Sequence, residues 1–281
     1  MNEVKIALVT ITRLGNKYLR EFIEYYLNIG VDKIYFYDNN RWREENVMDV
    51  VSDYVNNGLV EVIYFGNAEG RIQEIAYQDF YNNHGNEYDW ICYFDDDEYV
   101  VINSNENLKN FLSNPMFCDK NGVSFPMINY SDSGVIVNNK NTRLDVYTQI
   151  KNRGKIWANS FYKTIIRGGL NVTYIIGKYE GDDNIYDNSF HVPVVDLKVY
   201  NNIVDCDGNE VTYWVTMNET YNGYLKHIPT GCIDDFINMK MKRCWPGPER
   251  TDVKFDYEYF SKYNNPTNEK YQYYIEHTNL E

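Results

Sequence analysis

The chain has 281 residues, of which 43% are hydrophobic, and a formal net charge of −14. This composition allows a substantial buried core, while the acidic balance argues against nucleic-acid binding, because phosphate backbones are bound by clustered Lys and Arg. No apolar run approaches the roughly 20 residues of a transmembrane helix, and the N-terminus lacks the features of a signal peptide. The expected compartment is therefore the cytosol.

The first hundred residues alternate between the periodicities of strands and helices. Strands are predicted over Val4–Thr12, Lys33–Asp38, Leu59–Phe65 and Asp89–Phe94, and helices over Lys17–Ile29, Glu44–Asn57 and Arg71–His84. Such alternation predicts an α/β fold, with a mostly parallel sheet and helices on both of its faces.

The rest of the chain is less regular. Strands are predicted over Gly122–Asn129, Lys163–Arg167, Val172–Ile176 and Val192–Leu197, and helices over Asn107–Leu112 and Asp234–Lys242. Residues 132–152 are polar and predict a loop, and the Tyr-rich tail from Asp256 is expected to pack back on the body. With no repeat or linker, we expect one domain over residues 1–281, with a nucleotide-binding half over 1–102 and a second half over 103–281.

Polar clusters follow three of the predicted strands. They lie at Thr10 to Arg13, at Asp38 to Asn40 and at Asp95 to Glu98. Ligands of parallel sheets bind beyond the carboxyl ends of the strands, so these clusters are expected to converge on one crevice.

The acidic cluster is a candidate metal site. In an extended chain Asp95 and Asp97 point to the same side and can bind one divalent cation, although a solvated turn remains an alternative. An acidic protein needs such a cation to hold a diphosphate, which favours a nucleotide ligand with Mg²⁺ or Mn²⁺. Asp38 either binds a ribose or base of that ligand or forms an Asx turn with Asn39 and Asn40.

Several longer motifs lie in the same half of the chain. They are YLREFIEYYLNIGVD at Tyr18–Asp32, YFYDNN at Tyr35–Asn40, Gln73, Ala76–Tyr77 and DWICYFDDDEY at Asp89–Tyr99. Over about residues 4 to 102 these motifs resemble GT-A fold glycosyltransferases, more narrowly glycosyltransferase family 92 and related family-2-like bacterial enzymes.

The second half carries looser matches to the same pattern. They are Tyr130–Gly134 (YSDSG), Lys163–Arg167 (KTIIR), His191 and His227–Lys240 (HIPTGCIDDFINMK). Gly231 stands where the family usually has Lys, and Cys244 follows Arg243 where Gly is usual.

The resemblance implies a UDP-sugar donor and a metal-dependent site. Asp95 and Asp97 are the implied metal ligands, with His227 as the third; a nitrogen ligand suits Mn²⁺ better than Mg²⁺. Without the resemblance, His227 is more simply a polar strand residue. The remaining implied donor-binding residues are Thr10, Thr12, Arg13 and Asp38 for uracil and ribose, Asp96 for ribose or sugar, Arg71 and Gln73 near the sugar or diphosphate, and Lys240 for phosphate.

An inverting transferase also needs a base that takes the proton of the acceptor hydroxyl. Asp132 is the predicted base, because it follows the Gly122–Asn129 strand and matches the Asp of the bacterial pattern. A Ser-Asp-Ser-Gly turn is the alternative for Asp132, and Glu180, Asp182 and Asp183 are the reserves.

The predicted activity is transfer of a hexose from a UDP-sugar to a hydroxyl of a bacterial surface glycan such as capsule or lipooligosaccharide. A lipid-linked acceptor would bring the enzyme to the inner face of the membrane. Two alternatives remain: a nucleotidyltransferase acting on sugar phosphates, and a non-catalytic carbohydrate-binding protein, which the departures at Gly231 and Cys244 permit.

Overall fold

The first half of the chain folds into the predicted alternation. In this computed structural model the elements are β1 Ile6–Thr12, α1 Asn16–Asn28, β2 Lys33–Asp38, α2 Met48–Asn56, β3 Val60–Tyr64, α3 Ile72–His84 and β4 Trp90–Tyr93. The structure describes residues 3–68, 70–104, 106–151, 161–175, 177–181, 184–188, 193–196, 198–199, 201–211, 221–243 and 255–278, with the backbone alone at 174, 177–181, 184–188 and 199.

The second half is made of short elements. They are β5 Glu98–Ile102, α4 Leu108–Leu112, β6 Gly122–Asn129, β7 Tyr162–Arg167, β8 Val172–Tyr174, β9 Gly177–Gly181, β10 Asn184–Asn188, β11 Val194–Val195, β12 Lys198–Val199, β13 Ile203–Asp205, β14 Gly223–His227, α5 Ile233–Asp235, α6 Tyr257–Tyr263 and α7 Asn268–Thr278. The helix predicted over Asp234–Lys242 is shorter, because a π-helical turn over Phe236–Lys240 follows α5 directly.

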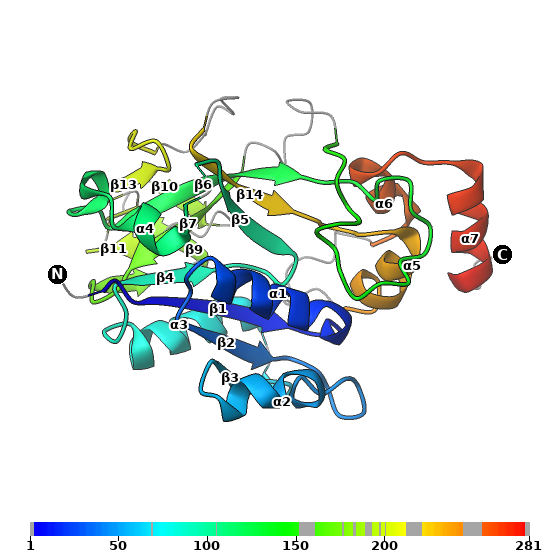
Figure 1. The fold of residues 1–281 in the computed structure, drawn as a ribbon, viewed down its shortest axis with the longest axis horizontal. Coiled ribbons are helices and arrows are strands. Elements are labelled where there is room, and N and C mark those ends of the chain that lie inside the picture. Colours follow the sequence, from blue (N-terminus) through cyan, green and yellow to red (C-terminus); the bar gives the residue numbers. More distant parts are fainter. Residues whose placement is uncertain are drawn as a thin grey trace.

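A nine-stranded sheet runs through both halves of the chain (Figure 1). Its order is β3-β2-β1-β4-β7-β6-β14-β5, with β13 paired to β6. The strands β1 to β4 are parallel to one another, whereas β7 is antiparallel to both of its neighbours and β5 is antiparallel to β14. Since β13 and β14 are parallel to β6, the sheet is mostly parallel, as predicted.

Helices cover both faces of the parallel strands. In β1 the residues alternate: Ile6 and Leu8 belong to the core that α1 and α2 help to form, while Ala7 and Val9 pack with α3 on the other face. Each large apolar side chain buried there contributes roughly 1.5 to 3 kcal/mol. The predicted α/β class with helices on both faces is confirmed.

The C-terminal tail packs on the body, as predicted. Phe260 of α6 and Tyr274 of α7 form a small core with Ile233 and Phe236. These helices lie together at one end of the sheet, beside α5 (Figure 1). In the described part of the chain, no helix is long and apolar enough to cross a membrane.

Candidate active site

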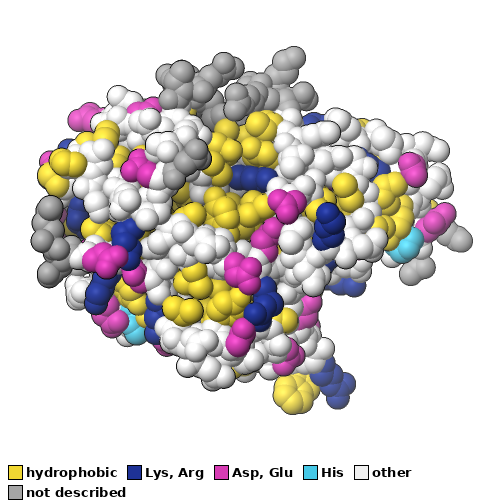
Figure 2. All heavy atoms as spheres, in the orientation of Figure 1, with side chains coloured by type: hydrophobic (Ala, Val, Ile, Leu, Met, Phe, Trp, Pro, Cys, Tyr) yellow, Lys and Arg dark blue, Asp and Glu magenta, His cyan; other side chains and the backbone are white. Residues whose placement is uncertain are grey.

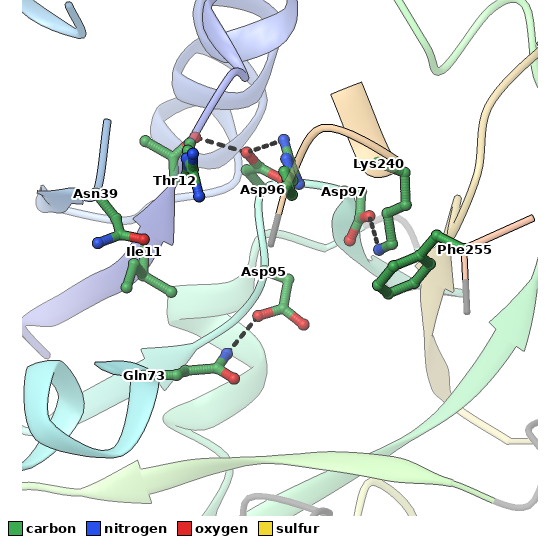
Figure 3. Close-up of a pocket in the computed structure, with 11 residues that line it drawn as sticks. Ile11, Thr12, Asn39, Gln73, Asp95, Asp96, Asp97, Lys240 and Phe255 are labelled. Atoms are coloured by element: carbon green, nitrogen blue, oxygen red, sulfur yellow. Dashed lines mark hydrogen bonds and ion pairs between the residues drawn. The ribbon is translucent and has the colours of Figure 1, made fainter. Parts of the chain in front are cut away.

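A pocket of about 180 Å³ opens where β1, β2 and β4 end. The residues that line it are Ile11, Thr12, Arg13, Asn39, Gln73, Asp95, Asp96, Asp97, Lys240, Arg243 and Phe255 (Figure 3). The three polar clusters predicted to converge therefore do meet at one edge of the sheet. Phe255, Lys240 and Arg243 come from the C-terminal part of the chain and close the far side of the pocket.

The acidic stretch is a turn between β4 and β5. The amide of Glu98 donates to the carbonyl oxygen of Asp95 at 3.0 Å, as in a β-turn. The side-chain alternation of an extended chain therefore stops at Asp95. Figure 3 shows the carboxylates of Asp95 and Asp97 with separate partners.

Asp95 faces the side of the pocket formed by α3 and β7. Gln73 Nε2 donates to Asp95 Oδ1 at 2.6 Å, and Lys163 Nζ lies 3.1 Å from Asp95 Oδ2. The Asp95 side chain is 36% exposed, against 6% for Lys163. Asp95 is thus an accessible carboxylate anchored to a buried cation of the sheet.

Asp96 lies against the N-terminus of α1. It accepts a hydrogen bond from Thr12 Oγ1 at 2.6 Å, and Arg243 binds both of its oxygens at 3.0 and 3.2 Å. Gly15 allows this close approach, because a Cβ at that position would lie 2.6 Å from Asp96 Oδ2. Asp96 is 3% exposed, so its charge is neutralised by Arg243 inside the protein.

Asp97 is directed toward the C-terminal segment. Lys240 Nζ lies 3.6 Å from Asp97 Oδ2, and His227 Nε2 lies 3.6 Å from Asp97 Oδ1. Burial by itself raises the pKa of Asp97, but the positive charges of Lys240 and Arg143 oppose it, and that pKa lies below the usual value. Asp97 is therefore ionised at neutral pH.

His227 is oriented as a ligand through its other nitrogen. Its Nδ1 lies 2.7 Å from the side-chain oxygen of Asn129, which only accepts, so Nδ1 carries the proton. Burial, partly opposed by the negative charge of Asp97, lowers the pKa of His227 to about 4. The neutral ring therefore presents an unprotonated Nε2 toward Asp97.

One group of described side chains has the spacing of a metal site. Asp97, Glu98 and His227 each offer one ligand atom, and these atoms all lie within 4.8 Å of one another. Two carboxylates and an imidazole form a donor set that suits Mn²⁺. Asp95, predicted as a ligand, lies outside this group with Gln73 and Lys163, and its ligand role stays a prediction.

Glu98 is the member of this group that the sequence analysis did not select. It is 1% exposed, and Lys163 Nζ lies 3.3 Å from Glu98 Oε1. Burial raises the pKa of Glu98 well above its usual value, and the nearby Asp95 and Asp97 add to this, while Lys163 opposes it. Lys163 thus contacts both Asp95 and Glu98.

The four consecutive carboxylates are compensated by four cations. Three of them are the cations named above, Lys163, Lys240 and Arg243. The fourth is the buried Arg143, which donates to the Asp96 carbonyl oxygen at 2.8 Å and stacks over the ring of Tyr18. Each cation comes from a distant part of the chain. The repulsion within the DDDE stretch is therefore offset by tertiary contacts.

The segment that carries Lys240 and Arg243 is anchored by Asp235. This buried carboxylate accepts hydrogen bonds from Tyr18 at 2.5 Å and Tyr147 at 2.6 Å, and Lys17 Nζ lies 2.7 Å away. Gly231, with φ +63°, lies against it, because a Cβ there would be 3.0 Å from Asp235 Oδ2. The glycine at this departure from the family pattern is thus required by the local packing.

The β1 cluster contributes two of its three predicted residues. Thr12 and Arg13 line the pocket, and Arg13 also holds Glu44 with contacts of 2.8 and 2.5 Å. Thr10 is fully buried inside the sheet, and its hydroxyl has no hydrogen-bond partner among the described residues. Thr10 therefore does not reach the pocket surface.

Asp38 adopts the alternative that the sequence left open. Its Oδ1 accepts from the Asn40 backbone amide at 2.9 Å and from the Asn40 side chain at 2.7 Å, which makes an Asx turn. Asp38 is 4% exposed and Asn39 lines the pocket in its place. Of the predicted pair Arg71 and Gln73, Gln73 of α3 lines the pocket, whereas Arg71, the residue before α3, bonds Glu74 and is not among the lining residues.

Asp132 lies in the turn that the sequence left open as an alternative. It is 1% exposed, its Oδ1 accepts from the Gly134 amide, and Lys270 Nζ of α7 lies 2.5 Å from its Oδ2. It is not among the pocket-lining residues, and its role as the base stays a prediction. Of the reserves, Glu180 lies in β9, where only the backbone is described; Asp182 and Asp183, like His191 and Cys244, lie outside the described residues.

Sequence reasoning missed the pocket roles of Arg243 and Phe255 and the ion pairs of Lys163. Lys163 carried a signal, since a lysine that opens an apolar strand predicts a buried partner carboxylate. Arg243 follows Lys240 by three residues, one helical turn, which also places both on one side of the segment.

The structure thus defines an α/β protein with a candidate cation site at the carboxyl edge of a parallel sheet. Residues 15–280 match the model of glycosyltransferase family 92, so the chain belongs to that family. The family and the observed sheet together confirm the expected GT-A fold class.

Comparison with solved structures gives low-scoring partial matches. A crystal structure of S. aureus TarS matches at 14% identity and a TM-score of 0.30, over 48% of this chain and 23% of that one. S. aureus TarS 1-349 in complex with UDP matches at 15% identity and a TM-score of 0.30, over 48% of this chain and 38% of that one. The chain thus spans well under half the length of either. No curated protein matches the sequence.

Proposed function

We propose that this chain is a metal-dependent glycosyltransferase that moves a hexose from a UDP-sugar, with inversion, to a hydroxyl of a bacterial surface glycan. The chain's membership of glycosyltransferase family 92 supports the reaction class. The donor, the stereochemical course and the acceptor extend beyond that membership and rest on the resemblance of the sequence motifs, while the metal rests on the chemistry of the site.

The observation that carries the proposal is the ligand group beside the pocket, of which Asp97 is a lining residue. Asp97, Glu98 and His227 hold their donor atoms within 4.8 Å, and the Asn129 contact leaves His227 Nε2 free of its proton. When bound there, a divalent cation supplies positive charge that stabilises a departing nucleoside diphosphate. We propose Mn²⁺, because it accepts both oxygen and nitrogen ligands.

Basic residues next to this group are suited to a diphosphate. Lys240, Arg243 and Arg13 all line the pocket. Their guanidinium and ammonium groups donate charge-assisted hydrogen bonds to phosphate oxygens. We propose that Lys240 and Arg243 bind the donor diphosphate, while Thr12, Asn39 and Gln73 contact its nucleoside or sugar.

The first test is a product assay with purified protein, Mn²⁺ and a panel of UDP-sugars. Release of UDP from UDP-glucose, UDP-galactose or their N-acetyl forms supports the proposal. Release of pyrophosphate instead would identify a nucleotidyltransferase. Absence of UDP binding by calorimetry with Mn²⁺ present would favour a non-catalytic carbohydrate-binding protein.

The metal assignment has its own test. Mn²⁺ binding, measured by loss of the free-ion signal in electron paramagnetic resonance, is expected for the wild type with UDP and not for His227→Ala. A His227→Ala variant that binds Mn²⁺ as the wild type does would remove His227 from the ligand set.

A further inference from the structure

The loop between β2 and α2 projects from the end of the sheet that carries the pocket. Figure 2 shows a hydrophobic side chain with a basic one beside it, standing out from the lower edge of the molecule over this loop. Trp42 in this loop is 85% exposed, more than any other large hydrophobic residue of the described chain. An indole in water on a protruding loop suggests an interaction surface.

The loop is held in a defined turn. The Glu44 amide donates to the Arg41 carbonyl at 3.0 Å, and Glu44 Oε2 accepts from the Arg41 amide at 2.9 Å. Arg43 has φ +73°, a left-handed conformation that a non-glycine residue adopts at a cost. Glu44 is in turn bound by Arg13, so the turn is fixed to the wall of the pocket.

The charge at the tip of the turn is positive. Arg41 and Arg43 flank Trp42, and among the described residues neither guanidinium is in an ion pair with a carboxylate. Of the acidic neighbours, Glu44 is balanced by Arg13, while Glu45 accepts from the neutral Asn16 amide at 2.9 Å, so the two arginines at the tip outnumber the one unbalanced carboxylate. The turn is thus a small positively charged site with a tryptophan at its centre, on a chain of net charge −14.

The shape of the turn selects among anionic partners. Small ligands and sugars bind in concave sites, whereas a single projecting indole offers no walls around a ligand. Trp is enriched at membrane interfaces, where its ring sits among the headgroups, and adjacent Arg side chains attract anionic lipids. Tyr64 and Met48, 57% and 37% exposed, add apolar surface at the adjoining ends of β3 and α2.

We propose that the Arg41-Trp42-Arg43 turn docks the protein on an anionic lipid surface by inserting the indole of Trp42 between headgroups. Because β1, β2 and β4 end at the same edge, docking through this turn places the pocket next to the bilayer. One aromatic side chain and two cations give weak, reversible attachment.

The test is co-sedimentation of the full chain with vesicles of phosphatidylcholine alone or mixed with phosphatidylglycerol. We expect binding to the mixed vesicles only, a loss of at least ~10-fold for Trp42→Ser, and a loss of about 5-fold per charge for Arg41→Gln and Arg43→Gln. Tyr271→Ser, which removes an exposed aromatic residue on the distant α7, is the matched control and is expected to bind as the wild type does.

Fluorescence distinguishes lipid insertion from general anion binding. Brominated lipids are expected to quench the wild type and not Trp42→Phe, in which the other four tryptophans remain. Equal binding to both kinds of vesicle, or unchanged vesicle binding of Trp42→Ser, would overturn the proposal. So would a third result, in which Trp42→Ser weakens binding to a soluble polyanion such as dextran sulfate as much as binding to vesicles, and brominated lipids do not quench the wild type. All of these readouts are independent of transferase activity.

Discussion

Replacing Lys240 by Met tests two interactions of this lysine, one with Asp97 and one with the proposed donor diphosphate. In the structure Lys240 Nζ lies 3.6 Å from Asp97 Oδ2, so its positive charge competes with a divalent cation for the Asp97 carboxylate. The same ammonium group lines the pocket where the proposed diphosphate binds. Lys240→Met is therefore expected to strengthen binding of Mn²⁺ alone and to weaken binding of UDP.

The size of the first effect follows from the distance. Two unit charges 3.6 Å apart interact by about 5 kcal/mol at an effective dielectric constant of 20, which is an upper limit. The Lys240 side chain is 23% exposed, and exposed pairs are worth about 0.2 to 1 kcal/mol. A value of about 1 to 2 kcal/mol lies between these bounds and corresponds to roughly 5- to 30-fold tighter Mn²⁺ binding.

The size of the second effect follows from the lost hydrogen bond. A charge-assisted contact to phosphate is worth about 1.5 to 3 kcal/mol, so UDP affinity measured with saturating Mn²⁺ is expected to fall by roughly 10- to 100-fold. The two affinities thus move in opposite directions in one variant. A general loss of structure would weaken both.

The assay is calorimetric titration of Mn²⁺ without nucleotide, followed by UDP at saturating Mn²⁺. Lys242→Met is the matched control, because it removes the same charge two residues further along the chain. The Lys242 side chain bonds Asn238 and not the acidic turn. The reasoning is refuted if Lys240→Met binds Mn²⁺ no more tightly than Lys242→Met does.

Three further variants test the site and its surroundings. Asp97→Ala is expected to abolish Mn²⁺ binding with little loss of thermal stability, because His227 is neutral and the Lys240 side chain, 23% exposed, reaches solvent; retained Mn²⁺ affinity would exclude Asp97 as a ligand. Asp132→Asn breaks a buried ion pair and is expected to destabilise the fold by about 3 to 5 kcal/mol with kcat unchanged, whereas a kcat at least ~10²-fold lower in a folded variant would restore Asp132 as the base. Gly15→Ala places a Cβ 2.5 Å from Thr12 Oγ1 and 2.6 Å from Asp96 Oδ2, so we expect about 1 to 3 kcal/mol of destabilisation, and a melting temperature equal to the wild type would contradict the close packing.

Local patterns predicted most of the first half of the fold. The spacing of Leu19, Phe22 and Ile23 gave α1 to within a residue or two, and the run Lys33–Asp38 matches β2. The same local patterns predicted the edge of the sheet at which the pocket lies, because parallel strands bring their carboxyl ends together. They did not predict the turn at the acidic stretch, where the Glu98 amide donates a hydrogen bond to the Asp95 carbonyl oxygen.

Contacts between distant residues set the remainder of the site. Asp132 is paired with a lysine 138 positions further along the chain, and no local pattern distinguishes a carboxylate with such a partner from one facing a substrate. The same holds for Asp96 and Arg243, which are 147 positions apart. The sequence placed the carboxylates at the pocket, but which cation each would face depended on the packing of the C-terminal segment.

The pairing of each aspartate in the acidic turn with its own cation has a kinetic consequence. Because carboxylates and cations balance locally, the pocket projects little field beyond the Debye length of about 8 Å at physiological ionic strength. At longer range an anionic nucleotide meets the net charge of −14 of the whole chain. Capture of the donor is therefore not accelerated by electrostatic steering, and added salt should speed the association or leave it unchanged, the opposite of what an open basic cleft shows.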